Sequence, residues 1–209
     1  MRLLDKLINN IKFDKKYALF CLTLVILGVI TGSLFIVILN STDKSLVIEY
    51  ISSYIDNIKN SATNNIDILK NTLITNYIII FILIVIGFSC FLFLINILIL
   101  FYKAFIIGFS LSSFILTYGI KGSLVSIFYI IPHLIINILI FSLITSFTLK
   151  ISINMIKCII NKKNVNMRLY FNKYFSIIIL SIIIITITGV YEAYILPNLI
   201  KFIIKLVSL

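Results

Sequence analysis

Long apolar blocks alternate with short polar segments along the 209 residues of the chain. Four of the five blocks exceed the roughly 20 apolar residues that a helix needs to cross a bilayer. The pattern therefore predicts an all-α, polytopic membrane helix bundle with about five transmembrane helices, all in a single integral membrane domain over residues 1–209. The predicted spans cover residues 17–39, 77–102, 104–118, 123–149 and 174–196.

Composition agrees with this prediction and excludes a soluble domain. Hydrophobic residues make up 61% of the chain and charged residues only 12%, with a mean hydropathy of +1.19. The net charge of +11 is best explained by basic residues that flank the membrane, so the lipid bilayer is the expected partner and nucleic acid is not. The three cysteines, Cys21, Cys90 and Cys158, are scattered, and they indicate neither a disulfide framework nor a metal site.

The N-terminal residues 1–16 place leucines and isoleucines at helical spacing among five basic residues. They predict a short basic amphipathic helix at the inner membrane surface. A cleavable signal peptide is the alternative, but its apolar region has about 7 to 15 residues and ends in a small-residue cleavage site. The block 17–39 is longer and lacks that site, so we interpret it as a retained anchor.

Residues 40–76 form an amphipathic outer segment after the first span. Apolar side chains, Val47, Ile51, Tyr54, Ile55 and Ile58, share one helical face, and the opposite face is polar. Two roles are open for this segment: a cap on the bundle, or a docking face for an extracellular partner.

Basic residues predict the topology. The N-terminus, Lys103 and the loop 150–173 together hold twelve Lys and Arg residues, against six in the segment 40–76, at Lys121 and in the C-terminal tail. The positive-inside rule therefore predicts a cytoplasmic N-terminus, an inner basic loop at 150–173 and an outer C-terminus. A re-entrant third segment would put the most basic loop outside, and the charge count disfavours it.

The stretch 101–138 carries most of the candidate functional residues. Lys103 is followed by small residues at intervals of four, Ala104, Gly108 and Ser112, which would let another helix approach closely. Gly119 and Gly122 then mark a tight helical hairpin. The open possibilities for these small residues include contacts within one chain and a homo-oligomer.

Five polar or helix-breaking residues stand out in or directly after the last two spans. Pro132 frees a backbone carbonyl, and His133 and Asn137 could satisfy groups in the bent helix or lie on a functional kink. Glu192 is expected near the outer end of the last span, either at headgroup level or bonded to Lys121, His133 or a hydroxyl group. Pro197 is expected to stop this span.

The sequence lacks the sets of residues that common enzymes need. A single His, scattered Cys and one Glu within the spans do not supply the converging ligands of a metal site. Neither a GxSxG nor a Walker-type GxxxxGK[ST] motif occurs. We therefore expect no cofactor and no enzymatic activity.

The segments FYKAFIIGFSLSSFILTYGIKG, IIPHLII and GVYEAYILP together resemble the stage II sporulation protein M family of endospore-forming bacteria. A KGFxxG-like segment, a Gly-rich turn, a Pro-His or Pro-Gln pair and a late Glu followed by Pro recur in this order in that family. Ala104 stands where the family usually has Gly. The resemblance covers nearly the whole chain.

This resemblance implies a membrane scaffold in the cell membrane at the sporulation septum and the engulfing membrane. It would recruit two peptidoglycan-degrading enzymes, stage II sporulation proteins D and P, during forespore engulfment. A permease-like subunit that works with a separate ATPase is the alternative function. A membrane-embedded enzyme that depends on His133 is a third.

Overall fold

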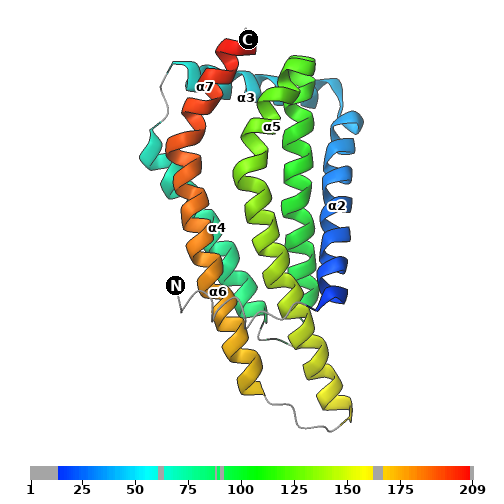
Figure 1. The fold of residues 1–209 in the computed structure, drawn as a ribbon. Coiled ribbons are helices and arrows are strands. Elements are labelled where there is room, and N and C mark those ends of the chain that lie inside the picture. Colours follow the sequence, from blue (N-terminus) through cyan, green and yellow to red (C-terminus); the bar gives the residue numbers. More distant parts are fainter. Residues whose placement is uncertain (1–13, 61–63, 88, 90–91, 162–166, 208–209) are drawn as a thin grey trace.

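Five long apolar helices dominate the computed structural model, which describes residues 14–60, 64–87, 89, 92–161 and 167–207. The described residues are helical apart from short connections, as Figure 1 shows. The predicted all-α membrane helix bundle is confirmed. Most of the expected N-terminal amphipathic helix, 1–16, lies outside the described residues, as do Cys90 and part of the basic loop 150–173.

The chain passes up and down the bundle five times. Helix α2 (Lys15–Ile38) leads to α3 (Ser41–Lys59), α4 (Asn65–Gly87) returns, and α5 (Phe93–Asn161) is a helical hairpin. Gly119, with φ of 60° and ψ of −138°, separates its two arms, residues 93–118 and 120–161. The last span is formed by three consecutive elements, α6 (Met167–Val190), the π-helical η1 (Tyr191–Ile195) and α7 (Leu196–Val207).

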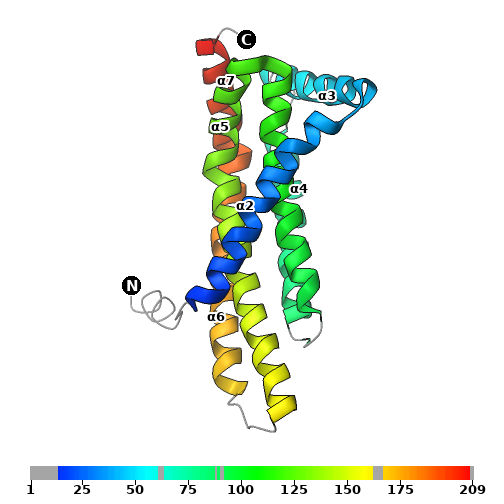
Figure 2. The same cartoon turned by 90° about the vertical axis from the view of Figure 1, so that its right-hand side faces the viewer.

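Helix α3 lies across one end of the bundle, nearly perpendicular to the spanning helices (Figures 1 and 2). Its apolar face is covered, since Ile51, Ile55 and Ile58 are buried against the hairpin of α5 and against α7. Burial of this face is the reason an otherwise polar helix stays on the bundle. We call this end of the bundle the α3 end.

The second arm of α5 and the start of α6 extend beyond the other helices at the opposite end (Figure 1). Lys150 on this arm makes an ion pair of 3.4 Å with Asp14, which precedes α2. This contact fixes the beginning of α2 to the longest helical arm in the molecule.

Several expected boundaries are wrong. The second span runs from Asn65 to Gly87 and not over 77–102, so the expected outer segment 40–76 contains α3 and the first half of a spanning helix. The third span begins at Phe93, which places Lys103 inside a helix and not in a connection. Pro197 does not stop the last span, because the helix continues to Val207.

Candidate functional site

A close helix contact joins α2 to the first arm of α5. A Cβ atom on Gly28 would lie 2.6 Å from the Cβ of Ala104, and one on Gly32 would collide with the carbonyl oxygen of Phe105. A Cβ on Gly108 would likewise collide with the carbonyl oxygen of Val29. The predicted small-residue face at Ala104 and Gly108 is therefore used within the chain.

The partner of that face was missed, although the sequence carries its signal. Gly28 and Gly32 are four residues apart in α2, the spacing of a small-residue contact between membrane helices. The hydroxyl group of Ser33 donates a hydrogen bond of 3.3 Å to the carbonyl oxygen of Gly108. Ser112, the last member of the predicted stripe, is half-buried one turn further along α5.

The glycines of the hairpin hold its two arms together at the α3 end. The positive φ of Gly119 is a conformation that residues with a Cβ rarely adopt. A Cβ on Gly122 would collide with the carbonyl oxygen of Phe114 on the first arm. The structure therefore contains the predicted tight hairpin at this point.

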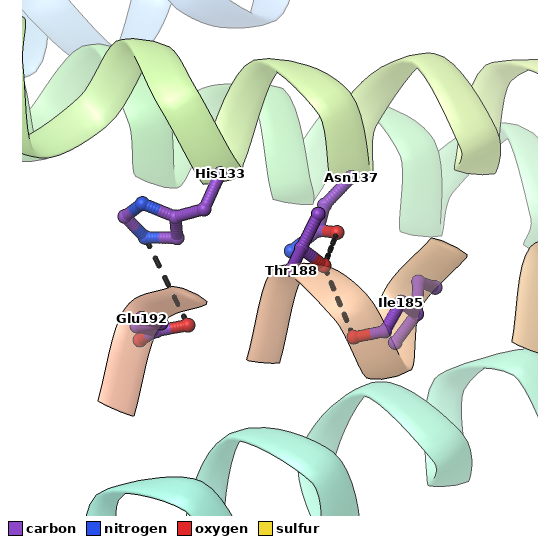
Figure 3. Close-up of polar contacts among 5 residues, drawn as sticks. All are labelled: His133, Asn137, Ile185, Thr188 and Glu192. Carbon is purple, nitrogen blue, oxygen red and sulfur yellow. Dashed lines mark hydrogen bonds and ion pairs between the residues drawn. The ribbon is translucent and has the colours of Figure 1, made fainter. Parts of the chain in front are cut away.

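His133 and Glu192 approach each other in the interior of the bundle (Figure 3). His133 follows Pro132 on the second arm of α5 and is 1% exposed, and its Nε2 lies 3.9 Å from Oε2 of Glu192. Glu192 belongs to η1, within the span Tyr174–Lys205 and not at its end. The expectation of a position near the outer end of the span is corrected, because the helix continues for 15 more described residues.

One turn from His133, Asn137 forms a second link between α5 and α6 (Figure 3). The hydroxyl group of Thr188 donates a buried hydrogen bond of 2.7 Å to Oδ1 of Asn137. The same hydroxyl oxygen, Oγ1 of Thr188, also lies 3.0 Å from the carbonyl oxygen of Ile185. Within a bilayer, such side-chain hydrogen bonds between helices are typically worth about 0.6 kcal/mol each.

Lys103 lies in the interior of the third span. Its Nζ is 5.7 Å from the centre of the Phe141 ring on the second arm, within the range of a cation–π interaction. A charge in this position is expensive in a membrane, about 2.5 to 3.5 kcal/mol at the centre of a spanning helix on insertion scales. A half-buried Lys in a span is therefore a candidate functional residue.

Lys103 and Glu192 line the same cavity, whose volume is about 280 Å³. The wall is built by α4, both arms of α5 and η1. Its polar side chains are Asn71, Thr72, Thr75, Asn76, Lys103, Asn137 and Glu192, and its apolar side chains are Ile106, Ile107, Leu134, Ile138 and Phe141. Five of the polar residues carry amide or hydroxyl groups, so the cavity is suited to binding a small polar group.

The polar wall on α4 was missed because residues up to Asn76 were assigned to the outer segment. Asn71, Thr72, Thr75 and Asn76 follow the helical spacing i, i+1, i+4, i+5 and so share one side of α4. This spacing was the available signal. It would have placed the four residues on one side of a spanning helix facing the bundle.

Metal binding finds no support in the described part of the chain, where no group of three His, Cys, Asp or Glu residues converges. Pro197, another candidate, lies in the first turn of α7. The helix runs without a break from η1 into α7, so Pro197 lies inside it and directly follows the π-helical turn. Its missing N–H group removes one hydrogen bond to the preceding turn. Pro197 does not line the cavity.

Comparison with known proteins gives one match. No curated protein and no solved structure matches the chain. The model of the family described as stage II sporulation protein M matches residues 18–197. This range contains most of each of the five apolar spans. It also contains the α2–α5 contact and every residue that lines the cavity. The chain belongs to the stage II sporulation protein M family.

Proposed function

We propose that this protein is a non-enzymatic membrane scaffold that recruits and positions peptidoglycan-degrading enzymes at the septum during engulfment. Membership of the stage II sporulation protein M family supports the setting. The partners that the resemblance implies are stage II sporulation proteins D and P. The structural observation that carries the proposal is α3, a surface helix that packs across one end of the bundle (Figure 1).

Helix α3 has the properties of a docking platform. Three isoleucines fix it from below, as Ile55 is 0% and Ile58 1% exposed. On the other side, Glu49, Tyr50 and Asp56 are exposed. An exposed aromatic residue between acidic residues is suited to a protein partner, because Tyr supplies contact area at a low cost in conformational entropy.

The distribution of basic residues supports an orientation with α3 outside the cell. With Lys103 now inside a span, the N-terminus and the segment 150–173 hold eleven Lys and Arg residues, against six at the α3 end. The positive-inside rule favours a cytoplasmic position for the more basic end. In this orientation α3 faces the compartment where cell-wall hydrolases act.

The test is an affinity pull-down of the tagged full chain from sporulating cells, with bound proteins identified by mass spectrometry. Point variants are needed, because deletion of 40–76 would remove half of a spanning helix. We expect Tyr50→Arg with Asp56→Lys to reduce the recovery of hydrolases at least tenfold. A matched control, Lys157→Glu on the exposed surface at the opposite end, should leave recovery unchanged.

Two results would contradict the proposal. One is equal recovery of hydrolases with the α3 variant and with the unaltered chain. The other is recovery of a nucleotide-binding subunit and no hydrolase, which would favour a permease-like subunit.

A further inference from the structure

The cavity between α4, α5 and η1 contains two opposite charges that do not touch. Lys103 and Glu192 both line it. No ion pair within 4 Å joins them among the described side chains. Direct pairing would be the simplest way to lower the cost of two charges in a membrane. Each of the two charged groups can therefore pair with an opposite charge on a ligand in the cavity.

Glu192 has one close neighbour on the second arm of α5. The Nε2 atom of His133 lies 3.9 Å from Oε2 of its carboxylate, and Thr72 of α4 lines the same cavity. A carboxylate on the cavity wall is a suitable partner for an ammonium group.

The cavity wall also presents hydrogen-bond donors besides Lys103. The Oδ1 atom of Asn137 is occupied by Thr188, which leaves its NH₂ group as a donor. Asn76 is buried and lines the same wall. An ammonium group with nearby amide donors is the environment in which proteins bind carboxylate or phosphate oxygens.

The polar stripe on α4 offers an entry to the cavity. Asn71 and Thr75 are exposed and one turn apart, while Asn76 behind them is buried. The volume of about 280 Å³ is just below the range of about 300 to 1,000 Å³ of sites for drug-sized ligands. A ligand here is therefore a small polar group, such as an amino acid or a lipid headgroup.

We propose that this cavity binds a zwitterionic group, with its anionic end at Lys103 and its ammonium end at Glu192. Two sources share this chemistry: the phosphoethanolamine headgroup of a membrane lipid, and a free amino acid. The proposal does not rest on the scaffold function, because it concerns the interior of the bundle and not α3.

The experiment measures the thermal unfolding midpoint of the purified full chain in detergent, with no partner protein present. Glycine and dioleoylphosphatidylethanolamine are the two zwitterionic probes. Acetate, ethylamine and dioleoylphosphatidylglycerol carry only one sign of charge and serve as controls. We expect a rise of several degrees with one or both zwitterionic probes, and the probe that acts identifies the source.

Variants test whether both charges are needed. Lys103→Met and Glu192→Gln should each abolish the rise in the midpoint. The matched controls Lys157→Met and Glu49→Gln, both at exposed positions, should retain it. The exchange variant Lys103→Glu with Glu192→Lys keeps both charges in the cavity and should retain part of the rise, which provides a test if a single variant does not fold.

Three outcomes would overturn the proposal. The first is no rise with either zwitterionic probe, which would indicate a cavity filled by water alone. The second is an equal rise with a probe of one charge. The third is a rise that persists in Glu192→Gln, because the ammonium partner would then be unnecessary. None of these results bears on hydrolase recruitment by α3.

Discussion

The first arm of α5 separates two interiors of opposite character. On one side Ala104 and Gly108 touch the backbone of α2, with no room for an additional methyl group. On the other side the neighbouring residue, Lys103, lines a polar cavity. The comparison shows that one helix turn can carry both a contact that stabilises the bundle and a charge that costs stability.

The two regions obey different energetic rules. Between membrane helices there is little hydrophobic driving force, so close van der Waals packing of small residues stabilises the α2–α5 contact. The cavity instead contains half-buried charges within the spans, and charges in such positions are expensive and tend to mark functional sites. We therefore expect substitutions in the α2–α5 contact to destabilise the bundle. Substitutions in the cavity should affect ligand binding and stability independently of each other.

The largest effect is expected from Gly32→Leu. Even a Cβ at this position would collide with the carbonyl oxygen of Phe105, so α2 must move away from α5. The free energy of unfolding should fall by about 3 kcal/mol, at the upper end of the usual range for overpacking. Thermal unfolding and size-exclusion chromatography in detergent measure this loss.

The neighbouring substitution Thr31→Leu is the control, because Thr31 is exposed on the same helix. It places a leucine on the same helix without facing α5, and the variant should unfold at the temperature of the unaltered chain. If both variants unfold at the same temperature, the close α2–α5 contact makes no special contribution to stability.

A smaller effect on stability is expected at the cavity, and its direction differs between the single and the double variants. Lys103→Met alone or Glu192→Gln alone leaves one charge in the bundle without its opposite, and each should lower the free energy of unfolding by about 1 to 3 kcal/mol. The double variant removes both charges. Its stability should equal or exceed that of the unaltered chain, because each of the two charges costs free energy inside a membrane span.

Chemical or thermal unfolding of the four proteins gives the coupling between the two sites. If the losses of the single variants simply add in the double variant, the two charges do not influence each other. The cavity would then resemble the α2–α5 contact, where each substitution acts through local packing.

The smallest effect is expected from Thr188→Val, which removes the hydrogen bond to Asn137 without changing the shape of the side chain much. The expected loss is about 0.6 kcal/mol, and about 1.7 kcal/mol at most. Thr23→Val is a suitable control, because Thr23 is exposed and bonds only to the carbonyl oxygen of Phe20 in its own helix. A loss above 3 kcal/mol would mean that the link between α5 and α6 contributes more than one ordinary hydrogen bond.

Five spans could be predicted because long apolar runs require a membrane and a helix at the same time. The boundaries could not, for a physical reason that Asn71, Thr75 and Lys103 illustrate. A polar residue in an apolar chain is normally cheapest outside the hydrocarbon, so it is assigned to a loop. These residues belong to spanning helices and line one cavity between them, and sequence spacing in one helix does not show what faces it from another.

The hairpin at Gly119 was predicted, since several glycines and polar residues mark it, whereas Gly87 and Ser89 give the connection after α4 only a weak signal. Residue 89 is a serine and both flanks are apolar. The pairing of His133 with Glu192 was one of several alternatives, because the two residues are 59 positions apart in the chain. Only the packing of α5 against the last span brings them together.

The π-helical turn at Tyr191–Ile195 sets the angular register of the last span. A π-helical turn contains more residues than an α-helical turn, so the residues after it are rotated relative to those before it. Glu192 thereby faces the cavity, while Leu196, Ile200 and Ile204 face the underside of α3. Loss of one residue from this turn would rotate α7 relative to α6, so that Glu192 could not face the cavity while α7 still packed against α3. The α3 platform and the cavity therefore depend on the same extra residue.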